Sequence, residues 1–398
     1  MDTGLDRLAT ERDIAKKVRG GRVALLAHPA SVTRDLVHAV DVLVGIGAKP
    51  RVIFGPEHGY GGEAQDMIGV TDARDIRGIP VKSLYGESYD ALIPTDDALS
   101  EIDTLVVDLQ DVGARYYTFV WTAVLAMRAC ARLKKRVLVL DRPNPVGCAT
   151  SSVEGRMQGP AFLSFVGLVP IPIRHALTLG DLVAWRAVEE GLSAGQVEVV
   201  AVRGIDRTEH APAWDRPFIF TSPNMPSYRT AMVYAGGCLL EGTNLSEGRG
   251  TTRPFEILGA PWIDGAKLAH DFHELGLAGV RVRPITFRPT FHKHAGETCG
   301  GVQVHVMDPL FFRPVRSYVA LIALAHRQNE ERFRFRRERY EFVDDIPAFD
   351  LLTGNREARA LIATGAPPMQ VASAVSEVDE SDLRAVRSAR EAGEESSV

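Results

Sequence analysis

The residues best placed for acid–base chemistry in this sequence are Glu57 and His58, which come just after the apolar run RVIF at residues 51–54. A carboxylic acid can pass a proton to a reacting atom, and a neighbouring imidazole can orient it. The alternative is that Glu57 caps a helix or sets a turn, but glycines follow it rather than a helix. Glu57 is therefore a candidate catalytic carboxylate, with His58 as a candidate partner.

A second group of reactive side chains lies in the segment 222–256. Six polar residues fall within eleven positions there, interleaved with glycines: Glu241, Asn244, Ser246, Glu247, Arg249 and Thr251. Asparagine, glutamate and arginine commonly hydrogen-bond sugar hydroxyls and carboxylates, and glycine lets the backbone approach a ligand closely. The alternative is an inter-domain loop held together by internal salt bridges.

The elements that must position these residues alternate between strand and helix in the first half of the chain. Continuous apolar runs predict buried strands at residues 22–27, 51–54, 104–109, 136–141 and 197–202. Helical spacing of apolar residues predicts helices at 33–46, between 117 and 135, and at 177–191. This alternation predicts the α/β class, with a Rossmann-like parallel sheet.

Polar residues follow several of these predicted strands. In an open parallel sheet, ligands bind outside the carboxyl ends of the strands. Asp108, Asp111 and Arg115 come at or after the third run, and Asp141 and Arg142 after the fourth. We expect these side chains to share one rim with Glu57. The alternative for Asp108 is an ion pair with Arg115 or Arg142 that only organises the rim.

The second half of the chain has a different pattern. Residues 207–260 are rich in proline, glycine, serine and asparagine and are predicted to be irregular. Strand-like alternation follows at 280–291, 301–306 and 332–343, with a helix at 316–328. These features predict a Rossmann-like domain at 1–260 and a smaller α+β domain at 261–398. The basic stretch after Arg332 is interpreted as a solvated strand face, and the end of the charged tail from Glu377 as frayed.

Bulk properties limit the possible partners. The 398 residues carry a formal net charge of −5, which gives no general attraction for nucleic acid or anionic membrane. The four cysteines are scattered and are expected to be reduced. The spacing of His292, His294 and Cys299 fits no standard zinc site, so no metal and no cofactor are expected. The absence of a secretory h-region and of a run of about 20 apolar residues predicts a cytoplasmic protein.

Six stretches in order closely resemble one known family: FGPEHGYGGEA, VVDLQDVGARYYTFVWT, VLDRPNPVG, SFVGLVPIPIRHALTLGDL, SPNMP and LLEGTNLSEGRGTTRPFEILGAPWI. They are similar to the NamZ-like (YbbC-like) exo-β-N-acetylmuramidases, and the likeness runs from about residue 21 to beyond 370. The resemblance implies an active site in the cleft between two domains and release of N-acetylmuramic acid from the non-reducing end of peptidoglycan fragments. It matches the glutamate of the family's PEHG motif to Glu57. The family's cleft segments match Asp108, Asp111, Arg115, Asn224, Glu241, Asn244, Glu247 and Arg249.

Glycoside hydrolysis requires an acid for the leaving oxygen and a second group that activates water or attacks the anomeric carbon. We expect Glu57 to be the acid and Glu247 the second carboxylate, with Glu241 and Asp108 in reserve. Because N-acetylmuramic acid carries a 2-acetamido group, attack by the substrate itself is also open. The lactyl carboxylate of the sugar suits a bidentate arginine, either Arg249 or Arg115. The partner is then a small muropeptide-derived disaccharide, and the oligomeric state stays open. Two alternatives remain: a non-catalytic protein that binds cell-wall sugars, and a Rossmann-type nucleotide or phosphosugar enzyme.

Overall fold

The first of two sheets has seven strands in the order β3-β4-β2-β1-β5-β6-β7. The computed structural model describes residues 1–65, 67–69, 71–193 and 195–398. All neighbouring strands run parallel except the edge pair β3-β4, which is antiparallel. The strands are β1 Val23–Ala27, β2 Val52–Gly55, β3 Ala73–Arg74, β4 Pro80–Ser83, β5 Thr104–Asp108, β6 Arg136–Leu140 and β7 Val197–Val200. The predicted α/β class with a parallel sheet is confirmed.

Successive residues of each central strand enter different parts of the core. Leu26 of β1 belongs to a cluster that includes the helices α5 (Phe119–Arg132) and α6 (Leu179–Glu189). Leu25 belongs to another cluster, which includes α1 (Gly4–Thr10), α2 (Arg12–Lys16) and α3 (Ala39–Gly45). Because both faces of a strand are covered, both of its side-chain rows must be apolar, which explains the unbroken apolar runs.

Helix α3 is shorter than predicted. The helix expected from residue 33 begins at Ala39, because Leu36 has a left-handed φ of 63° and His38 caps the helix through Nδ1. A non-glycine residue with positive φ cannot continue a right-handed helix. The apolar spacing before residue 39 therefore belongs to a turn.

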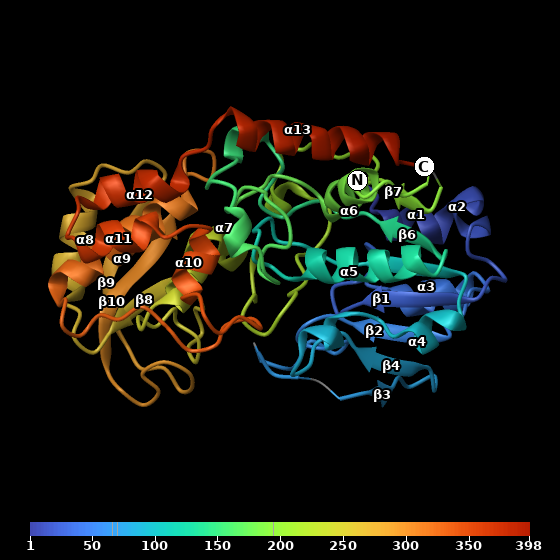
Figure 1. Ribbon diagram of the computed structural model, residues 1–398, viewed down its shortest axis with the longest axis horizontal. Helices are drawn as coiled ribbons and strands as arrows, with labels where there is room; N and C mark the ends of the chain where they lie inside the picture. The colour runs from blue at the N-terminus through green and yellow to red at the C-terminus, as the bar shows by residue number, and fades with distance from the viewer. Residues whose placement is uncertain (66, 70, 194) are drawn as a thin grey trace.

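The second sheet has three antiparallel strands in the order β8-β10-β9, namely β8 Ile257–Ala260, β9 Val280–Phe287 and β10 Cys299–Val306. The remaining α-helices are α4 Asp96–Ser100, α7 Tyr228–Gly237, α8 Gly265–His273, α9 Pro314–Gln328, α10 Ala348–Thr353, α11 Glu357–Ala363, α12 Pro368–Ser376 and α13 Glu380–Glu395. Short 3₁₀ helices occur at Tyr89–Leu92, Thr150–Ser152, Pro160–Phe162, Ala211–Ala213 and Cys238–Gly242. Figure 1 shows the two sheets at opposite ends of the molecule, with long connecting segments between them. We call the seven-stranded sheet with its helices the first lobe, and the three-stranded sheet with its helices the second lobe.

Two regions of the second half differ from the prediction. Helix α7 lies inside the segment predicted to be irregular, with Ser227 as its N-cap. Gly236 lets α7 approach α9, because a Cβ there would lie 2.1 Å from the carbonyl oxygen of Pro314. The predicted strand at 332–343 is wrong: only single bridges form, and Glu341 and Phe342 have left-handed φ angles that break the extended run.

The end of the chain is ordered, which corrects the predicted frayed tail. Helix α13 begins with a capping box at Asp379 and packs on α6 of the first lobe (Figure 1). Beyond it, the Val398 amide donates to the Val199 carbonyl of β7 at 2.9 Å. Across the described ranges, no helix combines the length and the apolar character that a bilayer crossing requires.

Candidate active site

The turn after β2 presents Glu57 at the carboxyl edge of the first sheet. Gly55 is required there, because a Cβ would lie 2.4 Å from the backbone nitrogen of Tyr60, where the chain folds back. His58 and Gly59 then take left-handed φ angles of 69° and 81°. Such backbone is costly for histidine and cheap for glycine, and it concentrates at functional sites.

Thr118 fixes the Glu57 carboxylate. Its Oγ1 donates to Glu57 Oε2 at 2.6 Å, and Thr118 is the residue that precedes helix α5. His58, predicted as a partner, instead contacts the carbonyl of Ala64 through Nδ1 at 2.8 Å and so holds its own loop. The sequence reasoning missed Thr118, because nothing marks it in the sequence apart from its place before the helix.

Glu57 lines a cavity with about 480 Å³ of space not filled by protein atoms. Both lobes and the long connecting segment contribute to its wall. The lining residues are Glu57, His58, Tyr116, Tyr117, Thr118, Phe119, Val166, Ser222, Asn224, Tyr234, Glu241, Arg249, Phe255, Tyr340 and Glu341. Five of the ten predicted site residues are among them: Glu57, His58, Asn224, Glu241 and Arg249. Three of the lining residues carry carboxyl groups, and one of these, Glu341, was not predicted.

Glu241 lies in a charged and phenolic group on the cavity wall. Arg249 Nη2 lies 3.0 Å from Glu241 Oε1, and the Tyr340 hydroxyl donates to Oε2 at 2.8 Å. Burial, together with the Glu241 charge, raises the pKa of Tyr340 well above its ordinary value. Tyr340 therefore stays a proton donor at neutral pH and can hold the carboxylate in place.

Aromatic rings form much of the remaining wall. Tyr234 packs edge-on against Tyr117 at 5.6 Å and against Phe255 at 4.9 Å, measured between ring centroids. The Tyr117 hydroxyl bonds Thr221, and burial raises the pKa of Tyr117. Aromatic rings beside fixed polar groups are a common composition of a small-molecule site. The stretch YYTF at 116–119 contributes all four of its residues to this wall.

Five predicted site residues lie outside this cavity, and two of them serve ion pairs or turns of the first lobe. Asp108 is fully buried and accepts hydrogen bonds from Nε and Nη2 of Arg142. This is the ion pair that the sequence offered as the alternative to a role in the site. Asp111 accepts from the Gly113 amide at 2.8 Å and lies 3.4 Å from His175. Both residues sit on the predicted rim but face into the protein.

Arg115, also outside the cavity, is a structural residue. Its guanidinium is fully buried and donates to the carbonyls of Arg156, Ile171 and Leu352 at 2.7–2.9 Å. Burial lowers the pKa of Arg115 to about 10, so it remains charged at neutral pH. These contacts join three separate segments, and they direct the guanidinium away from the cavity.

Glu247 and Asn244, the last of the five, also bind protein groups. Glu247 is fully buried, with Lys293 Nζ at 2.9 Å and His292 Nδ1 at 3.0 Å. Burial acts to raise its pKa, but Lys293, His292 and Arg249 outweigh burial and hold the pKa well below its ordinary value. Asn244 donates to the Arg332 carbonyl and accepts from the Arg334 amide. Glu247 therefore stands behind the cavity wall, on the far side of Arg249.

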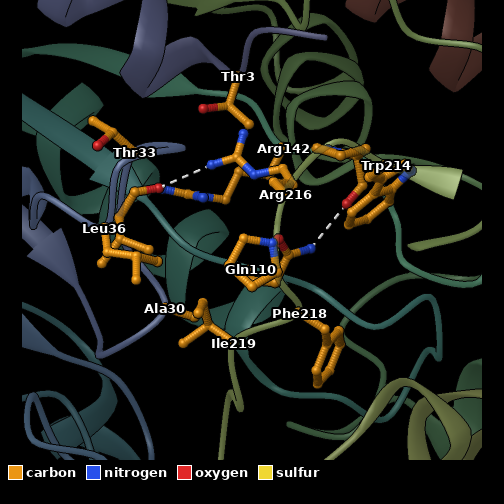
Figure 2. A pocket seen from close by; sticks show the side chains of 13 residues that line it. Thr3, Ala30, Thr33, Leu36, Gln110, Arg142, Trp214, Arg216, Phe218 and Ile219 are labelled. Carbon is orange, nitrogen blue, oxygen red and sulfur yellow. Dashed lines mark hydrogen bonds between the residues drawn. The ribbon is translucent and has the colours of Figure 1, made fainter. Parts of the chain in front are cut away.

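A second hollow opens at the ends of β1, β5 and β6, where Rossmann-type folds bind nucleotides. In Figure 2 the side chains of Arg142 and Arg216 lie side by side, and both donate to the Val32 carbonyl. Each arginine also has an aspartate partner, Asp108 for Arg142 and Asp6 for Arg216. The positive charge of this hollow is thus compensated within the protein. Among the described residues, no cluster of three or more His, Cys, Asp or Glu side chains could hold a metal ion.

Comparisons with known proteins place the chain in a family. Models of exo-beta-N-acetylmuramidase NamZ match it twice, the N-terminal model at residues 23–229 and the C-terminal model at 232–388. The peptidoglycan beta-N-acetylmuramidase NamZ of Bacillus subtilis (strain 168) is 39% identical over 368 residues, covering 92% of this chain and 85% of the relative. 

Solved structures agree with this likeness. Two DUF1343 family proteins of Bacteroides fragilis NCTC 9343 are similar to the chain. One has a TM-score of 0.85 at 29% identity and covers 100% of this chain and 98% of its own. The other has a TM-score of 0.73 at 26% identity and covers 98% of each. The chain therefore belongs to the exo-β-N-acetylmuramidase NamZ family and is a glycoside hydrolase.

Proposed function

We propose that this enzyme releases N-acetylmuramic acid (MurNAc) from the non-reducing end of peptidoglycan fragments such as MurNAc–GlcNAc, with Glu57 as the general acid. The observation that carries the proposal is the Glu57 carboxyl group, held by Thr118 on the wall of a cavity that both lobes line. The name of the Bacillus relative supports the sugar and the linkage.

The chemistry requires a proton at the glycosidic oxygen as its bond to the anomeric carbon breaks. Glu57 Oε2 accepts from Thr118, which leaves Oε1 as the oxygen that carries the proton toward the leaving group. Arg249 lines the same cavity, while Arg115 is bound to three carbonyls elsewhere. We therefore assign the lactyl carboxylate of the sugar to Arg249.

The test is incubation of the purified enzyme with MurNAc–GlcNAc, with free MurNAc and GlcNAc measured over time. We expect equimolar release of the two sugars. GlcNAc–MurNAc is the matched control, because it has the same composition but no MurNAc at the non-reducing end, and it should remain intact. Calorimetric binding of MurNAc–GlcNAc without release of either sugar would overturn the proposal and favour a non-catalytic sugar-binding protein.

A further inference from the structure

The turn that carries Glu341 has an unusual backbone for its sequence. Tyr340 and Val343 exchange two backbone hydrogen bonds at 2.9 and 3.0 Å, so Glu341 and Phe342 are the two residues of a tight loop. Their φ angles are 44° and 69°. Loops in which both central residues are left-handed strongly favour Asn-Gly, Asp-Gly or Gly-Gly, because other side chains strain the backbone. Glu-Phe at these positions points to a requirement for the side chains themselves.

The Phe342 side chain anchors this second-lobe turn on the first lobe. Its ring lies edge-on to Tyr85 at 5.8 Å and Tyr89 at 6.2 Å, and 6.0 Å from Phe165, measured between ring centroids. Aromatic packing of this kind stabilises the contact between the lobes. It also compensates for the strained backbone and fixes where the preceding residue points.

Glu341 is thereby directed into the cavity that Glu57 lines. Glu341 is buried, and the Tyr85 hydroxyl lies 3.1 and 3.3 Å from its two carboxylate oxygens. Glu247, the second carboxylate predicted from the sequence, stands outside the lining with Lys293 and His292. Glu241 also lines the cavity, but it comes from the connecting segment rather than from a turn that Phe342 anchors across the two lobes.

We infer that Glu341 is the second catalytic carboxylate, an assignment that rests on the proposed muramidase activity. Glu57 gives its proton to the leaving oxygen, which keeps the electron pair of the broken C1–O bond. Glu341 takes a proton from the water that forms the new bond to C1, or bonds to C1 itself and is later displaced by water activated by Glu57. Both routes consume one water molecule. In the first route Glu341 ends protonated and Glu57 ionised, and exchange with solvent returns the proton to Glu57; in the second route the attacking water re-protonates Glu57 directly.

Glu341→Gly is the variant that isolates this role, because glycine tolerates the left-handed φ and leaves space beside C1. The substrate is 4-nitrophenyl β-N-acetylmuraminide, assayed with and without sodium azide. We expect kcat to fall by about 10²–10⁴-fold. Azide should restore part of the turnover, as its nitrogen bonds to C1 while nitrophenolate leaves, and the product should be the α-configured muraminyl azide.

The controls separate catalysis from folding and from the underlying activity. Glu241→Gln should yield no azide product, and the melting temperature of Glu341→Gly should stay close to that of the wild type. If Glu341→Gly folds poorly, Glu341→Asn serves instead, because asparagine is also tolerated at positive φ. Wild-type turnover in the variant, or lost turnover with no azide product, would overturn the assignment. A wild-type enzyme inactive on the muraminide would instead contradict the proposed function.

Discussion

The two hollows at the carboxyl edge of the first sheet invite different interpretations. The hollow of Arg142 and Arg216 is where the fold class alone predicts a ligand, yet each arginine there is paired with an aspartate. The cavity of Glu57 also receives Glu341 and Tyr340 from the second lobe. A position at the strand ends therefore does not by itself make a site. The cavity differs because a second lobe completes it and adds Glu341 to the carboxyl groups in its lining.

Among the variants that test the difference between the two hollows, Glu57→Gln should cause the largest fall in kcat. This change keeps the shape and the Thr118 contact but removes the ionisable proton, so kcat on MurNAc–GlcNAc should fall by about 10²–10⁴-fold. The melting temperature should hardly change. Steady-state kinetics and thermal melts measure the two effects, and near-normal turnover would show that the cavity works without this acid.

Asp108→Ala should have the opposite effects to Glu57→Gln: it should lower the stability and leave kcat unchanged. It leaves Arg142 buried without its carboxylate, and breaking a buried ion pair in this way costs about 3–5 kcal/mol of unfolding free energy. Denaturant unfolding measures that loss. Protein that remains folded should keep its kcat, so a selective loss of kcat without loss of stability would move the chemistry to the arginine hollow.

Acidification should lower the free energy of unfolding through Glu247, which lies behind the cavity wall. Its folded-state pKa lies below the unfolded value of about 4.3, because Lys293, His292 and Arg249 outweigh its burial. The stabilisation of the folded state by ionised Glu247 is therefore fully present above about pH 4.3, and it is lost as the pH falls below that value. Unfolding free energies of wild type and Glu247→Gln should differ most at neutral pH and converge in acid. A constant difference between pH 7 and pH 3 would contradict this account.

Thr118→Val should have a smaller effect on the rate. A hydrogen bond to a charged group contributes about 1.5–3 kcal/mol, so misplacement of the Glu57 carboxylate should lower kcat by about 10–100-fold. Thr118→Ser keeps the hydroxyl and is the matched control, expected near wild type. Equal activity in the two variants would mean that the 2.6 Å contact does not position the acid.

The smallest expected effect is the response to nucleotides. The arginine hollow has its charges compensated, so ATP, NAD or UDP-sugars at millimolar concentration should leave the melting temperature unchanged. MurNAc should raise it. A rise with a nucleotide but not with MurNAc would favour a nucleotide-dependent enzyme.

The sheet and Glu57 were predictable from local patterns. Unbroken apolar runs occur where both faces of a strand are covered, and a glutamate after such a run must lie at the sheet edge. The direction in which a rim residue faces was not predictable in the same way. Arg115 and Asp108 have the composition of site residues, but their partners are carbonyls and an arginine distant in the sequence.

Glu341 was missed for a related reason. It lies 284 residues after Glu57, in a stretch whose alternation is typical of a solvated strand. The strained Glu-Phe turn that redirects it depends on the packing of Phe342 against rings of the other lobe. Such long-range packing leaves no periodic signal. The absence of glycine and asparagine also hid the turn.

Helix α13 returns the chain to the first lobe after the second lobe is complete. The backbone therefore crosses between the two lobes twice, once before α7 and once between α12 and α13. A lobe joined to its neighbour by one segment can rotate about many axes. A lobe joined by two segments rotates about the line that passes through both. Any rotation that opened the cavity between the lobes would have to follow that line, and it would separate Phe342 from Tyr85 and Phe165 of the first lobe.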